Sequence, residues 1–211
     1  MLVSASAICW ARQRCDIYQA SLARQLFTSG VRHWSRCYEY PWVALNGDFH
    51  EGQRCLDAGG GPGSMQTLLA EKGVHVVNVD IDPKWELARK NIEIVKGDLR
   101  KLDYPDGTFP RVVCLSVLEH IEKPQEVVKE LWRVLVPGGR LLVTLDVADY
   151  ARWNHTVDQR TAAGLVSLFG MTVPEFPADA LRQSFPETEP REGDRASVLL
   201  HVLCFWCDKP E

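Results

Sequence analysis

The feature that most constrains the fold is a glycine-rich stretch at residues 54–69, Arg-Cys-Leu-Asp-Ala-Gly-Gly-Gly-Pro-Gly-Ser-Met-Gln-Thr-Leu-Leu. A short apolar run ends at Asp57, the glycines follow, and a helical pattern begins at about Ser64, which predicts a strand, a tight turn and a helix. Glycines gather in this way where the backbone adopts positive φ or approaches a ligand closely. Because ligands of open α/β sheets lie beyond the carboxyl ends of the strands, we expect a binding site at this turn.

Strands and helices are predicted to alternate after this turn. The run at 74–80 is apolar almost throughout, as expected of a parallel strand that is covered on both faces. The predicted strands are 54–57, 74–80, 92–96, 111–115 and 140–145, and the predicted helices are 64–72, 83–91 and 124–135. This alternation predicts an α/β fold with a doubly wound parallel sheet and helices on both of its faces.

Composition narrows the classes of partner. A chain of 211 residues can bury one substantial core, and its net charge is -4. Proteins that bind nucleic acid usually carry basic clusters, so we expect no nucleic-acid partner. No apolar run approaches the roughly 18 residues that a membrane span needs, so we expect no membrane partner either.

The cysteines favour a reducing compartment. Their number is odd, seven, and they lack the spacing of a disulfide framework, which predicts a cytoplasmic protein. Cys204 and Cys207 have the spacing of a metal or redox pair, but they fall in an apolar strand, where positions three apart point to opposite faces. We interpret both as structural thiols and expect no metal site.

The first part of the chain is predicted to form an arm. Residues 1–50 are interpreted as an N-terminal helical arm packed on a core of residues 51–211, with an amphipathic helix at 17–27. An aromatic-rich segment at 33–42 follows this helix. Two roles are open for its rings: hydrophobic docking of the arm on the core, or a lid that covers a bound ligand and excludes water.

Two acidic residues end neighbouring strands. Asp57 either bonds backbone N–H groups of the glycine turn or acts near the ligand, and we favour the first role. Asp80 lies 17 residues after Gly63 (80 minus 63), close to the ~20-residue offset of a carboxylate that accepts from ribose hydroxyls. Asp82 precedes a proline and is interpreted as a helix cap.

In the order and spacing of four motifs, the chain resembles the class I S-adenosylmethionine-dependent methyltransferases. The motifs are Leu-Asp-Ala-Gly-Gly-Gly-Pro-Gly at 56–63, Val-Asp at 79–80, Lys-Gly-Asp-Leu at 96–99, and Ser-Val-Leu-Glu-His at 116–120 followed by Leu-Trp-Arg-Val-Leu-Val-Pro-Gly-Gly at 131–139. The resemblance is dense over residues 53–145. It implies a Rossmann-like methyltransferase fold with a seven-stranded, mostly parallel sheet, whose seventh strand is antiparallel between the fifth and sixth. The run at 198–206 suits that seventh strand.

The resemblance also implies S-adenosyl-L-methionine as the cofactor and assigns residues to its adenosine half. Asp80 would bind the ribose hydroxyls, and Ile81 would pack on the adenine. Asp98 would accept from the adenine amino group, and Leu99 beside it would offer a backbone N–H.

For the methionine half, the resemblance implies contact with the glycine turn and with the end of the fourth strand. Gly59, Gly61 and Gly63 would lie against the methionine part. Ser116 and Val117 would line the sulfonium side of the pocket.

The glycine spacing argues against a nicotinamide-binding turn, which is a distant alternative with oxidoreductase activity. That turn has the pattern Gly-x-Gly-x-x-Gly and aims a helix N-terminus at a pyrophosphate. Here Ser64 stands where that pattern places its third glycine or alanine. S-adenosylmethionine has no phosphate, so close approach of the backbone matters more than an anion site.

His120 is the candidate catalytic residue. If the acceptor is a hydroxyl or an ammonium group, a base must remove its proton, and an imidazole titrates near neutrality. The alternative is a structural role for residues 119–121 at a helix start. His155 and Asp158 are further candidates for the base.

Two functions remain open at this point. The first is an enzyme that methylates O, N or C of a small molecule, and the second is a catalytically silent domain that binds S-adenosylmethionine and acts as a partner or regulator. Residues 116–119 differ from the Asn/Asp-Pro-Pro-aromatic tetrad of many nucleic-acid and protein amino-methyltransferases, which favours a small-molecule acceptor. The segment 146–170 is expected to cross the mouth of the pocket.

Overall fold

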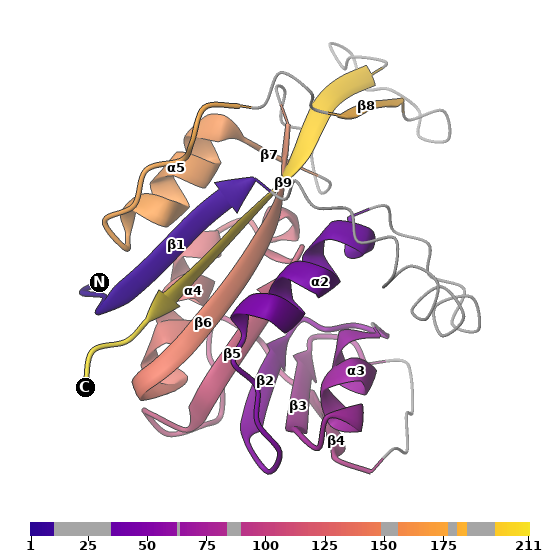
Figure 1. Cartoon of the computed structure of the whole chain (residues 1–211), viewed down its shortest axis with the longest axis vertical. Coiled ribbons are helices and arrows are strands. Elements are labelled where there is room, and N and C mark those ends of the chain that lie inside the picture. Colours follow the sequence, from indigo (N-terminus) through magenta and orange to yellow (C-terminus); the bar gives the residue numbers. More distant parts are fainter. Residues whose placement is uncertain (11–34, 63, 84–89, 149–155, 177–180, 185–196) are drawn as a thin grey trace.

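The chain forms one sheet with helices on both faces (Figure 1). The computed structural model describes residues 1–10, 35–62, 64–83, 90–148, 156–176, 181–184 and 197–211. The main strands are β1 Ala5–Trp10, β2 Arg54–Ala58, β3 His75–Asp80, β4 Ile92–Lys96, β5 Phe109–Leu115, β6 Leu135–Ala148 and β9 Ser197–Asp208, in the order β1-β9-β6-β5-β2-β3-β4. Two short strands lie off this path: β7 Val157–Asp158 pairs with β6, and β8 Leu181–Ser184 pairs with β9.

The pairing directions confirm the predicted fold class. Strands β2 to β6 pair in parallel, and β9 runs antiparallel to β6. Strand β4 has the predicted bounds, and β9 extends the apolar run that was expected to be the antiparallel strand. The strand predicted at 140–145 is part of the longer β6, which also contains the Pro-Gly-Gly sequence at 137–139; there Gly138 has φ +72°, and regular pairing with β5 resumes at Arg140.

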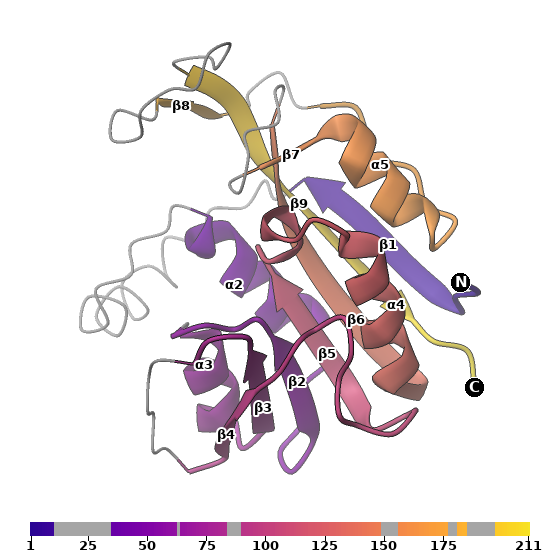
Figure 2. The same ribbon diagram turned by 180° about the vertical axis from the view of Figure 1, so that it is seen from behind.

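The helices cover the two faces of the sheet in pairs. Helices α2 Arg36–Asn46 and α3 Met65–Glu71 lie on one face, and α4 Pro124–Val134 and α5 Gln159–Ser167 lie on the other (Figures 1 and 2). A single 3-10 turn, η1 Leu118–His120, follows β5. The helix predicted at 83–91 falls mostly on residues outside the described part of the chain.

Alternating side chains of the central strands build two separate cores. In β2, Cys55 packs with Tyr40, Met65 and Leu69 on the side of α2 and α3. The next residue, Leu56, belongs to the larger core on the side of α4 and α5. Burial on both faces explains why these strands are almost continuously apolar in sequence.

Strand β1 was not anticipated by the sequence reasoning. It forms the outer edge of the sheet, antiparallel to β9, with a register that runs from Ala5 opposite Asp208 to Trp10 opposite Leu203. Strand β9 therefore lies between β6 and β1, so the position expected for a sixth strand is taken by a segment from before β2. The six residues of β1, Ala-Ser-Ala-Ile-Cys-Trp, begin with three small side chains and do not alternate regularly between apolar and polar, so they gave no clear strand signal.

We expect Trp10→Phe to lower the free energy of unfolding by about 1 kcal/mol, because it removes a partly buried hydrogen bond. The indole Nε1 of Trp10 donates to the carbonyl oxygens of Glu175 (2.9 Å) and Pro174 (3.3 Å), and the residue is 4% exposed. Urea denaturation measures the change. Leu2→Ala, at a residue that is 85% exposed, is the control and should stay within ~0.5 kcal/mol of the wild type. An unchanged midpoint for Trp10→Phe would contradict the packing of β1.

Helix α2 contains most of the aromatic segment. Tyr40 is buried in the core beside α3, and Trp42 packs against the same cluster. Tyr38 packs against Val202 and Cys204 of β9. These contacts are those of the docking alternative, and the role of the arm as a lid stays a prediction. The helix expected at 17–27 lies outside the described residues.

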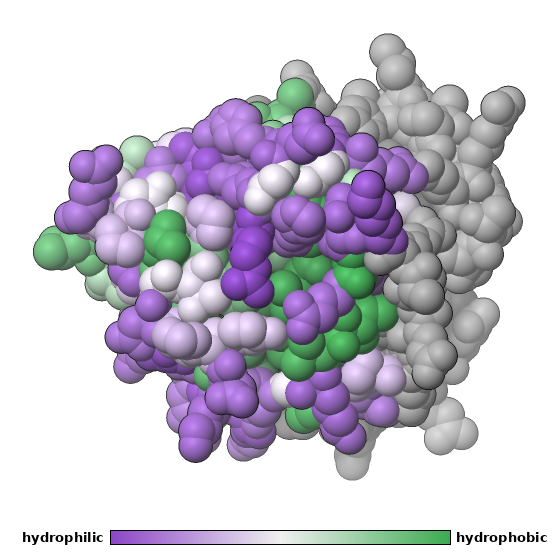
Figure 3. All heavy atoms as spheres, turned by 90° about the horizontal axis from the view of Figure 1, so that it is seen from below, coloured by the Kyte–Doolittle hydropathy of each residue, from purple (hydrophilic) through white to green (hydrophobic). Residues whose placement is uncertain are grey.

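The lower end of the sheet, where the central strands begin, is shown in Figure 3. Its surface is mostly hydrophilic, with one area of hydrophobic side chains near the middle.

Within the described residues, no helix is both long and apolar enough to cross a membrane. Cys204 and Cys207 of β9 are buried in different clusters, on opposite faces of the strand as predicted.

Candidate functional site

The order of the strands reverses between β5 and β2, and the candidate site lies at the carboxyl ends of these strands. Such a switch point is where open α/β sheets bind ligands. Gly59 follows β2 and its N–H donates to the carbonyl of Val79 (2.8 Å). Ser116 follows β5, and its N–H donates to the carbonyl of Thr144 (3.2 Å). The glycine turn and the end of β5 lie side by side because β2 and β5 pair in parallel.

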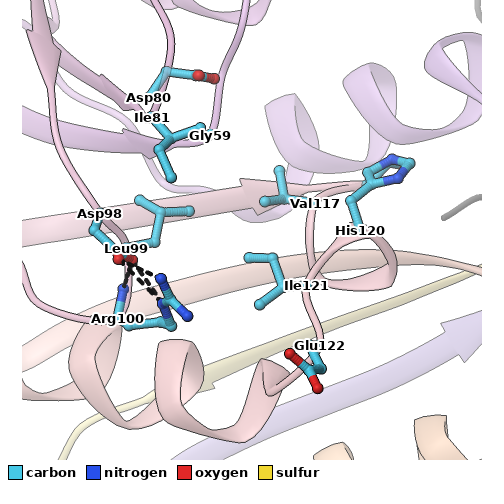
Figure 4. A pocket seen from close by; sticks show the side chains of 11 residues that line it. Gly59, Asp80, Ile81, Asp98, Leu99, Arg100, Val117, His120, Ile121 and Glu122 are labelled. Carbon is cyan, nitrogen blue, oxygen red and sulfur yellow. Dashed lines mark hydrogen bonds and ion pairs between the residues drawn. The ribbon is translucent and has the colours of Figure 1, made fainter.

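A cavity of about 400 Å³ opens at this point (Figure 4). Its volume lies within the usual range for small-molecule sites. Most of the predicted site residues line it together with three that were not predicted. The lining residues are Gly59, Asp80, Ile81, Asp98, Leu99, Arg100, Ser116, Val117, His120, Ile121 and Glu122.

Asp80 and Ile81 form one side of the cavity, at the end of β3. The Asp80 carboxylate is held in place because its Oδ1 accepts from the backbone N–H of Asp82 (3.0 Å). Ile81 is 65% exposed, which is unusual for a large apolar side chain beside a cavity. The pair offers an acceptor for hydroxyl groups next to an apolar surface on which a flat ring can pack.

Asp98 lies at the end of β4 and is paired with Arg100, which the sequence reasoning missed (Figure 4). Arg100 donates to both carboxylate oxygens, from Nε to Oδ1 (3.0 Å) and from Nη2 to Oδ2 (2.7 Å). These hydrogen bonds lower the pKa of Asp98, so the carboxylate is ionised at neutral pH. The only sequence signal for Arg100 was its position two residues after the acid.

Gly59 and Val117 meet across the cavity floor. Gly59 has φ +71°, and a Cβ placed on it would lie 2.8 and 2.9 Å from the two methyl carbons of Val117. Leu99 lies next, with Cδ1 at 3.4 Å from the same point. Glycine is therefore needed at position 59 for backbone conformation and for space.

Asp57 and Gly61 shape the turn but do not line the cavity. The Asp57 carboxylate lies beneath Gly60, where an added Cβ would be 2.2 Å from Oδ2. The Gly61 carbonyl accepts from the side-chain amides of Gln66 and Asn78, both at 2.9 Å. Their contact with a cofactor stays a prediction, and Gly63 lies outside the described residues.

Burial controls the protonation of Asp57. The residue is 2% exposed, and within the described part of the chain its Oδ2 has no hydrogen-bond partner. Burial raises its pKa to about 7, with a further contribution from Asp80 that opposes the attraction of Arg36. The hydrogen bonds predicted from the turn to Asp57 are not made to this oxygen by the described residues.

His120 stands at the opposite end of the cavity from Asp98 and Arg100 (Figure 4). It is exposed, it ends the 3-10 turn after β5, and its imidazole points away from Leu99. Its role as a base stays a prediction. Asp158 has a structural role, because its side chain caps α5 by accepting from the N–H of Thr161 (2.7 Å). His155 lies outside the described residues.

Two buried carboxyl groups, those of Glu119 and Asp146, lie near the end of β5. Glu119 and Asp146 are 7% and 3% exposed, and Glu119 Oε1 accepts from the backbone N–H of Asp146 (3.2 Å). Burial raises the pKa of Glu119 to about 8, and nearby Glu39 adds to this effect. Among the described residues, no group of three or more His, Cys, Asp or Glu could hold a metal ion.

The comparison with protein families agrees with this geometry. A family model described as a methyltransferase domain matches residues 56–143, the segment that carries the glycine turn, Asp80, Asp98 and the end of β5. Over these residues the chain is similar to a methyltransferase domain. The match argues against the alternative that the glycine turn belongs to a nicotinamide-dependent oxidoreductase.

Curated relatives of the methyltransferase domain are 28–34% identical over the aligned parts. Demethylmenaquinone methyltransferase of Deinococcus radiodurans is 32% identical over 133 residues, which is 58% of this chain and 53% of that protein. Sterol 4-C-methyltransferase strm-1 of Caenorhabditis elegans is 28% identical over 182 residues, or 77% of this chain and 54% of that protein. The chain thus spans about half the length of the curated relatives it matches.

Solved structures share the fold of most of the chain. The YcgJ protein of Bacillus subtilis has a TM-score of 0.62 at 16% identity, covering 82% of this chain and 98% of that one. The 1,6-didemethyltoxoflavin-N1-methyltransferase of Burkholderia thailandensis has a TM-score of 0.59 at 18% identity, covering 99% and 97%. At these identities the likeness concerns the fold.

Proposed function

We propose that the methyltransferase domain binds S-adenosyl-L-methionine and transfers its methyl group to a small-molecule acceptor. The observation that carries this proposal is the position of Asp80 beside the exposed Ile81, in a cavity at the switch point of the sheet. A carboxylate fits a pair of ribose hydroxyls, and the apolar side chain fits a purine. The residues present therefore fit this cofactor.

Different residues around the cavity bind different parts of the cofactor. Asp80 accepts from the ribose hydroxyls, Ile81 and Leu99 pack on the adenine, and Asp98 accepts from its amino group while it stays paired with Arg100. Gly59 in the cavity lining approaches the methionine part, and we propose the same contact for the backbone at Gly61 and Gly63. Ser116 and Val117 line the sulfonium side. When bound, the cofactor supplies an activated methyl group. The domain's task is to align the acceptor with it and to exclude water.

The acceptor is inferred to be a small molecule. The curated relatives named above are methyltransferases of demethylmenaquinone and of sterols, both small molecules. The net charge of -4 supports the same inference because it does not favour nucleic acid. We also infer a reducing, cytoplasmic location, supported by the free thiols at Cys9, Cys55, Cys114, Cys204 and Cys207.

Calorimetry with S-adenosyl-L-methionine and with its demethylated product tests the cofactor. Incubation with labelled cofactor and a pool of metabolites then tests the transfer. Binding with release of label to an acceptor supports the proposal. Tight binding without turnover would replace it with the catalytically silent domain, and the absence of binding to either compound would refute both.

We expect Asp80→Ala to weaken binding of S-adenosyl-L-methionine roughly 10- to 100-fold, because it removes charge-assisted hydrogen bonds to the ribose. Calorimetry measures the dissociation constant. Glu51→Ala is the matched control: it removes an exposed carboxylate in the turn before β2, at the other end of the sheet, and should leave the affinity unchanged. Equal affinities for the two variants would argue against Asp80 as the ribose ligand.

We further propose that His120 is the general base. His120→Ala should lower kcat by about 10²- to 10⁴-fold with the acceptor found in the metabolite pool, as expected for loss of a positioned base. The affinity for S-adenosyl-L-methionine should stay within twofold of the wild type and serves as the internal control. Undiminished turnover would remove His120 from the catalytic residues.

A further inference from the structure

Ser116, where β5 ends, has an uncommon backbone conformation. Its φ is +49°, in the left-handed region that its Cβ disfavours. A non-glycine residue persists there when its surroundings hold it. Ser116 also turns the chain toward the cavity, where it and Val117 form part of the lining. The position of Val117 against Gly59 therefore depends on the conformation of Ser116.

A chain of hydrogen bonds holds Ser116 and ends on Glu39 of α2. The Ser116 N–H donates to Thr144 Oγ1 (3.1 Å), and the Thr144 hydroxyl donates in turn to Glu39 Oε1. The Ser116 hydroxyl donates to the same oxygen (2.5 Å). One carboxylate oxygen thus orients both hydroxyls, and the Thr144 oxygen is left free to accept from the Ser116 backbone.

The other oxygen of Glu39 is fixed from within α2 and its start. Glu39 Oε2 accepts from Ser35 Oγ (2.9 Å) and from Arg36 Nη1 (2.5 Å). Glu39 is fully buried, and Arg36 together with the hydroxyl hydrogen bonds lowers its pKa in spite of that burial. The carboxylate is therefore an acceptor on both oxygens, as the two hydroxyl donors require.

We propose that Glu39 is a positioning residue for the cofactor pocket, which through Ser116 and Thr144 fixes the end of β5 so that Val117 closes the wall against Gly59. This inference rests on the proposed binding of S-adenosyl-L-methionine. It gives α2, which precedes the segment matched by the family model, a part in forming the pocket.

The test is the affinity for S-adenosyl-L-methionine, measured by calorimetry. Glu39→Gln should bind about tenfold more weakly, because an amide cannot accept on both sides, and the wall loses its fixed position. Val43→Ala is the matched control: Val43 is also fully buried in α2 and packs in the core, but its apolar side chain makes no hydrogen bond to Ser116 or Thr144. It should lower stability without changing the affinity.

A double-mutant cycle separates positioning from simple docking of α2. Glycine adopts the left-handed conformation freely. Glu39→Gln should therefore weaken binding much less in a protein that already carries Ser116→Gly than it does in the wild-type protein. If Glu39 only anchors α2, the loss will be the same in both backgrounds. Should Glu39→Gln fail to fold, Thr144→Val breaks the same chain of hydrogen bonds with little change of shape and is expected to weaken binding by a similar factor.

The possible results are distinct. If the wild-type protein binds S-adenosyl-L-methionine and Glu39→Gln or Thr144→Val binds it with the same affinity, the role of Glu39 is overturned while the proposed function stands. Equal weakening by Glu39→Gln and Val43→Ala would also overturn it, since it would reflect the loss of α2 packing. Absence of binding by the wild-type protein would overturn the proposed function, and this inference with it.

Discussion

Gly59→Ala is expected to weaken the binding of S-adenosyl-L-methionine by at least about a hundredfold, which corresponds to roughly 2.7 kcal/mol. The left-handed conformation at φ +71° costs an alanine about 1–2 kcal/mol. In addition, the new Cβ would lie 2.8 Å from Val117 Cγ1, so the floor and the wall of the pocket have to move apart. Calorimetry with the purified variant measures the loss.

Two other glycines separate these contributions. Gly61 has φ +53° but nothing within 4 Å of an added Cβ, so Gly61→Ala tests conformational strain without a clash. Gly164 in α5 has neither strain nor a neighbour within 4 Å, and Gly164→Ala should leave binding unchanged. Adding Val117→Ala to Gly59→Ala should recover part of the lost affinity, because it removes the methyl groups that clash. Wild-type affinity of Gly59→Ala would show that this contact does not shape the pocket.

The free energy of unfolding is expected to fall by several kcal/mol as the pH rises from about 5 to about 8.5. Burial raises the pKa of Glu119 to about 8 and that of Asp57 to about 7. At pH 6 these acids are protonated in the folded protein but ionised in the unfolded chain, so the folded state binds more protons. Stability is therefore lost as the pH rises from the ordinary pKa values of these acids to their folded ones, at about 1.4 kcal/mol per pH unit for each group.

Glu119→Gln isolates the contribution of one acid. The amide resembles the protonated carboxyl, so the variant should match the wild type near pH 4.5, at the ordinary pKa of a glutamate, and be more stable by a few kcal/mol at pH 8.5. Urea denaturation at a series of pH values measures both slopes. If the two proteins lose stability in parallel between pH 5.5 and 8.5, the carboxyl of Glu119 does not titrate in this range.

At low pH a different set of acids makes the free energy of unfolding fall as the pH falls. Hydrogen bonds and ion pairs lower the pKa of Glu39, Asp98 and Asp158 in the folded protein. The stability that they contribute is complete above their ordinary pKa values and is lost as the pH falls below them. For the described residues, these two groups of acids together predict that the free energy of unfolding is largest at mildly acidic pH.

The parts of the site that the sequence predicted are those set by strand ends. Asp80 ends β3 and Asp98 follows β4 by two residues, so their meeting at one edge follows once these parallel strands are placed. The predicted bounds of β4 were correct, and the family resemblance then pointed to Ile81 after β3 and to Leu99 after β4, which both line the cavity. Strand positions and the resemblance were sufficient because each of these residues depends on its own strand.

The parts that were missed depend on contacts between distant segments. Glu39 bonds to Ser116 and Thr144, which lie 77 and 105 residues away, and no local pattern marks it as more than a charge on a helix. Arg100 is an exception: it lies only two residues from Asp98, and it was missed because the sequence does not show that the two side chains pair. Strand β1 was missed because its partner in the sheet lies near the other end of the chain.

The pairing of β1 with β9 also sets the order in which the sheet can be completed during synthesis. Strand β1 leaves the ribosome long before β9, but Trp10 pairs with Leu203 and Ala5 with Asp208. The parallel strands from β2 to β6 can associate while translation continues, whereas the outer edge has to wait for the last of its partners. Until β9 has been synthesised, β1 and one side of β6 lack the strand with which they pair in the folded sheet, and such unpaired edges favour aggregation.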